Sequence, residues 1–402
     1  MEIPVLKDIL SFKTFPKDVK ILILSSLVLS FNMGFMYVDF PVYLSQVGYN
    51  AYLIGIILAI PTLVGALLMI PMGSLSDRYG RKKFILIARA FSFFGGIIYL
   101  FTYQFYLILL AGILQGIAFA NSSSSYSALM AEKTENKNRN VIFASNSFIT
   151  GIFMAVGMII GGIPPYIQQV YHLDIFESYR YLFLMGIFGY LISTVLIFFV
   201  KEQYKGTEKA KLFPEKSKSI IIKLSVLSLI GLGAGVIVRL FPYWFYLKYG
   251  INVDILGPIF AISQVVTAFA SMTSPWIASK LGEIKTIVVT EAMSVVILIT
   301  MPLLPFYYLA GLFLITRNAL MNMSGPIMTS FTMSIIPPEE RALGSALIQF
   351  FDAIPRSFGP ALGGYFIYIG FLDLPFYFTG ALYSVSIVMF YIFFRCIKLK
   401  KR

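Results

Sequence analysis

Seven charged side chains lie inside long apolar stretches of the sequence, where a charge is energetically costly. At the centre of a bilayer such a side chain costs a few kcal/mol unless it is paired or hydrated, so it marks an ion pair, a substrate site or a proton pathway. The seven residues are Asp39, Arg89, Arg239, Glu291, Arg317, Asp352 and Arg356.

Two of these charges, Asp352 and Arg356, stand four residues apart. Residues at this spacing are neighbours on a helix, so a static ion pair is one expectation for them. A structural salt bridge is likewise one expectation for Asp39 and Arg239. Arg89 and Glu291 lie near one end of their stretches and are expected to snorkel to the membrane surface or to brace neighbouring helices.

The composition is that of a membrane protein. Hydrophobic residues make up 58% and charged residues 13% of the chain, whereas soluble domains are about 25% charged. The mean hydropathy is +0.81. The net charge of +13 is spread over short loops, so nucleic acid is not an expected partner.

The chain offers little material for a cofactor or a metal. Cys396 is the one cysteine and His172 the one histidine, which excludes a disulfide framework, a thiolate zinc site and an iron–sulfur cluster. A metal site built from His172, Asp174 and Glu177 is disfavoured because no further ligands lie nearby. We therefore expect no cofactor and no metal, and find no histidine cluster or Cys–His pair that would favour an enzyme.

Twelve apolar stretches are long enough to cross a bilayer, whose core requires about 20 apolar residues. They cover roughly residues 20–46, 51–75, 83–103, 105–131, 140–166, 180–200, 220–249, 253–279, 285–304, 307–335, 341–369 and 374–395. A polar linker, residues 201–219, separates two bundles, residues 1–200 and 220–402. Most Lys and Arg residues fall in loops on the side of the termini, so the positive-inside rule predicts that both termini and the linker are cytoplasmic.

The two halves of the chain are related by an internal duplication. Asn50 and Asn252 are 202 positions apart, and the same offset separates several pairs of glycines and one pair of arginines. The pairs are Gly55 and Gly257, Gly80 and Gly282, Arg139 and Arg341, Gly157 and Gly359, Gly161 and Gly363, and Gly162 and Gly364. Two parallel repeats of six helices are typical of one large group of transporters.

A short charged segment after the second apolar stretch carries the strongest motif. It reads Gly73-Ser74-Leu75-Ser76-Asp77-Arg78-Tyr79-Gly80-Arg81-Lys82-Lys83. This segment resembles the loop between the second and third helices of major facilitator superfamily transporters. The resemblance implies twelve transmembrane helices in two pseudo-symmetric six-helix bundles and an all-α integral membrane fold.

In that family the loop forms a cytoplasmic gate. The aspartate, here Asp77, lies near the start of the eleventh helix, which Pro337 to Arg341 resemble, and a helix N-terminus attracts an anion. The cationic partners expected for Asp77 are Arg81 and Arg139. The residues that the resemblance assigns to the gate are Gly73, Asp77, Arg78, Gly80, Arg81, Arg139 and Arg341.

Small residues on the fifth and eleventh helices favour close helix packing. They are Gly157, Gly161, Gly162, Gly359, Gly363 and Gly364. The drug/proton antiporter branch has a G-P-x-x-G-G signature on the fifth helix, where this chain has Met158, while the full signature begins at Gly359. The fourth helix has Gln115 in place of the branch's arginine, and Arg317 is its counterpart in the second half. The sequence as a whole is nearest the twelve-helix drug and metabolite efflux branch.

The resemblance also implies which residues line a central cavity. Asp39, Arg239 and Arg317 lie on helices that line it in the family, and Asp39 is the first candidate proton carrier, followed by Asp352. The cavity charges Asp39, Arg239, Arg317, Asp352 and Arg356 include three arginines and two aspartates, which slightly favours an anionic solute. The neutral cavity residues expected are Asn32, Asn121, Gln264, Asn318, Asn322, Tyr243 and Trp244.

The sequence therefore predicts a secondary transporter of the cell membrane. It has no G-x-x-x-x-G-K-[ST] nucleotide loop, so transport is expected to be secondary or by facilitated diffusion. The resemblance to the efflux branch makes proton-coupled efflux of a small organic solute the first hypothesis. Import of an organic anion or sugar, by proton symport or by uniport, is the alternative, and a non-transporting sensor is the alternative of another class. Protons, the solute and the lipid bilayer are the expected partners of a monomer.

Overall fold

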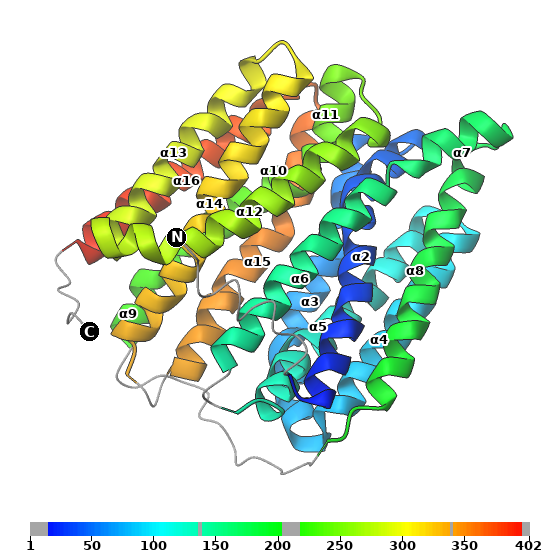
Figure 1. The fold of residues 1–402 in the computed structure, drawn as a ribbon. Coiled ribbons are helices and arrows are strands. Elements are labelled where there is room, and N and C mark those ends of the chain that lie inside the picture. Colours follow the sequence, from blue (N-terminus) through cyan, green and yellow to red (C-terminus); the bar gives the residue numbers. More distant parts are fainter. Residues whose placement is uncertain (1–14, 136–138, 203–217, 338–340, 396–402) are drawn as a thin grey trace, which may run out of the picture. The chain divides into compact units, whose positions relative to one another are not determined.

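The structure is a computed structural model that describes residues 15–135, 139–202, 218–337 and 341–395. These ranges fold into helices and contain no strand (Figure 1), which confirms the all-α prediction. The helices of the first half are α2 (Lys17–Gln46), α3 (Ala51–Tyr79), α4 (Arg81–Phe101), α5 (Phe105–Glu132), α6 (Arg139–Ile160), α7 (Ile163–Tyr171) and α8 (Ile175–Phe198).

The second half contains longer helices and short 3-10 segments. They are α9 (Lys218–Leu224), η2 (Ser225–Leu227), α10 (Ser228–Ile237), η3 (Val238–Leu240), α11 (Phe241–Tyr249), α12 (Val253–Leu281), α13 (Glu283–Thr300), η4 (Met301–Leu303), α14 (Tyr307–Ile335), α15 (Arg341–Tyr368) and α16 (Leu374–Phe394). Over the described residues, ten helical stretches are long and apolar enough to cross a membrane, by length and composition. The more polar α14 and α15, of 29 and 28 residues, are not among the ten.

Most predicted spans agree with the observed helices to within a few residues, and three differ. The fifth span breaks at Gly161 and Gly162 and continues as α7. The sixth begins at Ile175 because the side chain of Asp174 accepts a hydrogen bond from the Glu177 backbone N–H and caps the helix. The seventh is not one regular helix, since η2 and η3 interrupt it.

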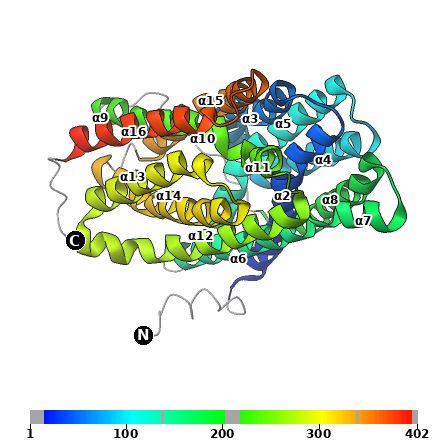
Figure 2. The same cartoon turned by 90° about the horizontal axis from the view of Figure 1, so that it is seen from above.

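The chain divides into two compact units. Unit 1 comprises residues 1–48, 64–208 and 252–261, and unit 2 comprises residues 49–63, 209–251 and 262–402. Each unit therefore contains helices of one sequence half together with the first turns of one helix from the other half, α12 in unit 1 and α3 in unit 2. Within each unit the long helices run alongside one another (Figures 1 and 2).

Unit 1 is built around the close approach of α2 to α6. A Cβ atom added to Gly157 of α6 would collide with the carbonyl oxygen of Phe31, and one added to Gly34 of α2 would collide with that of Met154. α2 also packs against α8, and α4 packs against α5 and α8. An apolar cluster that includes Leu22 closes one end of this packing.

Unit 2 repeats this arrangement with α10 and α15. A Cβ atom at Gly359 of α15 would collide with the backbone of Gly235 in α10, and one at Gly235 would collide with the carbonyl oxygen of Arg356. α10 also packs against α16, and α13 packs against α14 and α16. In lipid, where apolar burial gives helices no drive to associate, such close contacts hold them together.

The duplicated glycines make equivalent contacts in the two units. Gly257 of α12 lies against the carbonyl oxygen of Met158 in unit 1, and Gly55 of α3 lies against that of Pro360 in unit 2. Gly257 lies 202 positions after Gly55, and Pro360 lies 202 positions after Met158, so the two contacts are related by the same offset as the repeats. The duplication predicted from single residues thus extends to pairs of contacting residues.

The α10–α15 contact gives a first testable prediction. Gly359→Ala should lower the stability of the folded protein by about 1–3 kcal/mol, because the added methyl group has no space beside Gly235. Thermal unfolding of the purified protein measures the effect.

Gly325→Ala in α14 is the matched control, because a Cβ atom there meets no atom within 4 Å. Alanine favours a helix over glycine, so this variant should unfold at the same or a higher temperature. Equal unfolding temperatures for the two variants would show that the contact is not rigid.

Candidate functional site

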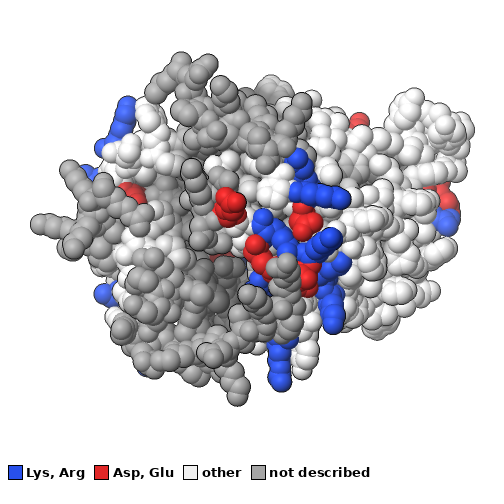
Figure 3. Space-filling view, turned by 60° about the horizontal axis from the view of Figure 1, so that its bottom comes forward, with Lys and Arg blue, Asp and Glu red and all other residues white. Residues whose placement is uncertain are grey.

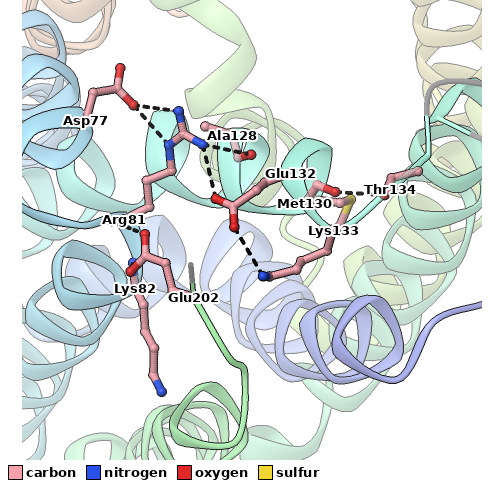
Figure 4. A network of polar contacts seen from close by, with 9 residues as sticks. All are labelled: Asp77, Arg81, Lys82, Ala128, Met130, Glu132, Lys133, Thr134 and Glu202. Carbon is pink, nitrogen blue, oxygen red and sulfur yellow. Dashed lines mark hydrogen bonds and ion pairs between the residues drawn. The ribbon is translucent and has the colours of Figure 1, made fainter. Parts of the chain in front are cut away.

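The turn between α3 and α4 holds a network of ionic and backbone contacts in unit 1 (Figure 4). Arg81 binds Asp77 with an N–O distance of 2.9 Å and reaches Glu132 of α5 at 3.4 Å. The same guanidinium donates to the carbonyl oxygen of Ala128 at 3.4 Å. Arg81 thus connects the end of α3 to the end of α5.

Glu202, which follows α8, fixes the start of α4. Its two carboxylate oxygens accept hydrogen bonds from the backbone N–H groups of Arg81, at 2.7 Å, and Lys82, at 3.1 Å. The first N–H groups of a helix have no partner within the helix, and an anion there is stabilised by the helix dipole. Lys82 in turn donates to the carbonyl oxygen of Phe198 at 2.8 Å.

The backbone at Gly80 explains why the turn requires glycine. Its φ of 109° lies in a region that favours glycine, and a Cβ atom there would lie 3.3 Å from the Glu202 carboxylate. Its counterpart Gly282, between α12 and α13, has a φ of 86°. Both repeats therefore use the same turn, but the acidic residue Asp77 occurs in the first only.

The backbone contacts outweigh the exposed ion pair in this network. The side chain of Asp77 is 46% exposed, and an exposed ion pair contributes about 0–1 kcal/mol. A hydrogen bond to a charged group contributes about 1.5–3 kcal/mol, and Glu202 accepts two. Glu202 and Glu132 were missed in the sequence because only the folded chain brings the ends of α5 and α8 to this turn.

The other predicted gate residues are only partly described. Gly73 accepts a hydrogen bond from Ser76 at 2.9 Å, and the exposed Arg78 lies over the ring of Tyr79. Arg139 and Arg341 begin α6 and α15, and their side chains lie outside the described residues. The predicted approach of Asp77 to the start of the eleventh helix stays a prediction.

One face of the molecule carries a group of basic side chains with acidic side chains among them (Figure 3).

Asp39 of α2 is buried in unit 1, with 2% of its surface exposed. Its carboxylate lies against Gly161, where any larger residue would overlap it. Over the part of the chain that the structure describes, neither carboxylate oxygen has a hydrogen-bond partner. Arg239, considered with Asp39 in the sequence, is an exposed residue of η3 in unit 2.

Asp352 and Arg356 form the ion pair that their spacing predicts. Arg356 donates to both carboxylate oxygens of Asp352 at 2.9 Å, on one turn of α15 in unit 2. The side chain of Asp352 also lies close to Gly231 of α10. The two candidate proton carriers therefore differ, since Asp352 has a cationic partner in direct contact.

Arg317 of α14 is buried in unit 2, with 3% of its surface exposed. It donates to the side-chain oxygen of Asn318 at 2.9 Å and to the hydroxyl group of Tyr383 at 3.2 Å. Asn318 donates in turn to Ser263 of α12 at 2.9 Å. The guanidinium also lies over the rings of Phe241 and Tyr383.

Three of the predicted cavity residues take part in packing within a unit. Asn32 is buried and donates to the carbonyl oxygen of Gly186 in α8 at 2.9 Å. Asn121 is buried and donates within its own helix, to Ile117. Trp244 is fully buried, and its indole N–H donates to Asp373 at 3.0 Å.

The remaining predicted cavity residues differ in their exposure. Tyr243 is buried beside Trp244 in α11, Gln264 and Asn318 are half-buried, and Asn322 is exposed. Asn322 donates to the carbonyl oxygen of Asn318 at 2.8 Å. Asn322 and Asn318 of α14 thus lead from an exposed position to the residue next to Arg317.

The buried charges Arg89 and Glu291 occupy equivalent places in the two units. Arg89 is 3% exposed and donates to Ser193 at 2.9 Å and to Ser122 at 3.2 Å, so it braces α4 against α8 and α5 and does not snorkel. Glu291 is 4% exposed, and Ser324 lies within hydrogen-bonding range of its carboxyl group. Ser324 is 202 positions after Ser122, as Glu291 is after Arg89.

The acidic residues around His172 have structural contacts. Asp174 caps α8, and Glu177 binds Arg180 at 2.7 Å. Within the described residues, no group of three His, Cys, Asp or Glu side chains could hold a metal ion.

Comparisons with known proteins identify the family. The model of the Major Facilitator Superfamily matches residues 22–360. An uncharacterized MFS-type transporter of Methanocaldococcus jannaschii is 27% identical over 68% of this chain and 71% of its own length. A class H tetracycline resistance protein of Pasteurella multocida is 24% identical over 60% of each chain.

Solved structures share the fold. A D-xylose-proton symporter superimposes with a TM-score of 0.74 at 15% identity, over 95% of this chain and 98% of its own. At this identity the likeness concerns the fold alone, which agrees with the match of the family model. The chain therefore belongs to the Major Facilitator Superfamily and is a membrane transporter of a small solute, not an enzyme.

Proposed function

We propose that this protein exports a small organic solute from the cytoplasm in exchange for protons, and that Asp39 carries the proton. The observation that supports this role is the burial of Asp39 with both carboxylate oxygens lacking a hydrogen-bond partner in the described chain. A charged carboxylate in such a place is costly, whereas a protonated one avoids the cost of burying a charge. Asp39 would therefore take up or release its proton in a state in which water reaches it.

Asp352 is less suited to carry the proton. Its charge is balanced by Arg356, which binds both carboxylate oxygens at 2.9 Å. Removing the charge of Asp352 would leave Arg356 without its partner, at a cost that the partial exposure of the two side chains, 32% and 39%, reduces. Protonation of Asp352 would thus require separation from Arg356, whereas protonation of Asp39 requires no ion pair to break.

The position of Asp39 allows its protonation state to affect helix packing. Its carboxylate touches Gly161 at the break between α6 and α7, and the next residue, Gly162, packs against Val253 at the start of α12. A hydrated, charged Asp39 needs more space than a buried, neutral one. Loss of the proton would therefore loosen the α2–α6 contact at this break.

The α3–α4 turn is the proposed cytoplasmic gate. Its network ties the end of α3 and the start of α4 to the ends of α5 and α8, so it holds the ends of four helices of unit 1 together. The positive-inside rule supports a cytoplasmic location for this turn and for both termini in the cell membrane. A single chain is the proposed working unit.

Similarity to a tetracycline resistance protein supports export over import. A transporter confers resistance when it removes a compound from the cell.

Proton symport, uniport and a non-transporting sensor predict different outcomes in one assay. The assay uses liposomes that contain the purified protein and a pH-sensitive dye.

In this assay Asp39→Asn should abolish solute-driven proton movement. The amide keeps the shape of the side chain but cannot exchange a proton. The solutes are added one at a time and include tetracycline, benzoate and D-xylose, and the initial rate of the dye signal is measured.

Asp18→Asn is the matched control, because Asp18 lies in the first turn of the same helix. It should keep the wild-type rate. Proton movement in the direction opposite to the solute supports antiport, and movement in the same direction means symport. An Asp39→Asn rate equal to that of the wild type would refute the assignment of the proton carrier. Solute entry without any dye signal would mean uniport, and neither entry nor a dye signal with any solute would favour a non-transporting sensor.

A second prediction concerns Glu202. Glu202→Ala removes both acceptors for the first N–H groups of α4, so the amides of Arg81 and Lys82 should exchange with solvent at least tenfold faster. Hydrogen–deuterium exchange of peptides from the α3–α4 turn measures this change.

The exposed Glu135, beyond the end of α5, provides the control. Glu135→Ala should leave exchange in the α3–α4 turn unchanged. Exchange in Glu202→Ala that matches the wild type would mean that other contacts hold the turn.

A further inference from the structure

Arg317 is a buried cation in unit 2 whose hydrogen-bond partners are neutral. Its guanidinium binds the Asn318 amide and the Tyr383 hydroxyl group, and its Nε atom has no hydrogen-bond partner in the described ranges. No carboxylate of the described residues forms an ion pair with it. An arginine at membrane depth without an anionic partner is costly to keep, which points to an anion that is not part of the protein.

Two aromatic rings flank this guanidinium. The distance from its central carbon to the ring centroid is 5.7 Å for Phe241 of α11 and 5.8 Å for Tyr383 of α16. Such contacts stabilise a cation and leave its Nε–H group without a hydrogen-bond partner in the described ranges. The planar fork of an arginine matches a carboxylate, which accepts two parallel hydrogen bonds from it.

Other charges near Tyr383 do not neutralise Arg317. The Arg356 guanidinium and the Glu291 carboxyl group lie within electrostatic range of Tyr383. Arg356 is paired with Asp352. Glu291 is buried on α13 and forms no ion pair with Arg317 within 4 Å, so it supplies no counter-charge in contact with the guanidinium.

A polar route leads from the surface to Arg317. Asn322 is exposed, Asn318 is half-buried one turn away, and Arg317 lies directly next to Asn318 in the chain. Ser263 of α12 holds the amide of Asn318 in place. A solute that reaches the Nε edge of the guanidinium would meet Nε and the terminal nitrogen that bonds Tyr383 in this structure.

We infer that Arg317 is the recognition residue for an aromatic carboxylate, bound between Phe241 and Tyr383. The carboxylate accepts hydrogen bonds from Nε and a terminal nitrogen of Arg317, and the Tyr383 hydroxyl group, which accepts from Arg317 in this structure, donates to the bound anion. The inference rests on the proposed transport function and names its substrate class. Binding of the carboxylate can be measured without proton movement and does not depend on the direction of transport.

The experiment measures binding by the full-length protein in detergent. The probes are benzoate and indole-3-acetate, each compared with its neutral amide, benzamide or indole-3-acetamide, by the ligand-induced rise in unfolding temperature. Each carboxylate should stabilise the wild-type protein and its amide should not. Arg317→Gln should weaken carboxylate binding tenfold to a hundredfold, which is the range for a charge-assisted bidentate contact.

Three further variants make the result specific. Arg89→Gln is the matched control, because Arg89 is as buried as Arg317 and also binds neutral groups, and it should bind carboxylates like the wild type. Glu291→Gln should not weaken binding, because Glu291 forms no ion pair with Arg317. Tyr383→Phe removes only the hydroxyl group and should weaken binding several-fold, which keeps the test open if Arg317→Gln does not fold.

The outcomes separate this inference from the proposed function. Wild-type protein that responds no more to either carboxylate than to its amide would overturn the inference, as would unchanged binding by Arg317→Gln. In the same way, equal weakening by Arg89→Gln and Arg317→Gln would mean a general loss of packing. Asp39→Asn should bind carboxylates normally while lacking proton movement, so failure of the Asp39 assignment leaves this result intact.

Discussion

Direct contact between helix backbones, made possible by glycine, is the interaction on which the rest of this structure depends. It joins α2 to α6 in unit 1 through Gly34 and Gly157, and α10 to α15 in unit 2 through Gly235 and Gly359. Helices in lipid associate through such close packing because their apolar surfaces are already out of water, so the hydrophobic effect does not drive association there. The same contacts bring polar side chains close to backbone, and Gly161 leaves the space that Asp39 occupies.

The two repeats share this backbone packing but not their charges. Position 39 of the first repeat, an aspartate, corresponds to Phe241 in the second, and Gln115 corresponds to Arg317. Gln115 donates to a carbonyl oxygen of α4, whereas Arg317 is buried beside Phe241. Positions 39 and 115 of the first repeat correspond to 241 and 317 of the second. Position 39 carries the proposed proton site in unit 1, and positions 241 and 317 carry the proposed anion site in unit 2.

Much of the fold and part of the site could be predicted from the sequence. Long apolar stretches predicted the helices, and the spacing of Asp352 and Arg356 predicted their ion pair. Gly80 marked the turn before α4. These three features could be predicted because each depends on residues that are close together in the chain. The cap that Glu202 forms, the burial of Trp244 and the break at Gly161 depend on helices distant in sequence. No local pattern indicates which helix end lies beside α4.

α12 contributes residues to both units. Gly162, next to the glycine that Asp39 touches, packs against Val253 at the first turn of α12, and Ser263 of the same helix binds Asn318, the neighbour and partner of Arg317. α12 thus takes part in the packing beside Asp39 in unit 1 and in the contacts of Asn318 in unit 2, so each unit relies on this helix at its own proposed site.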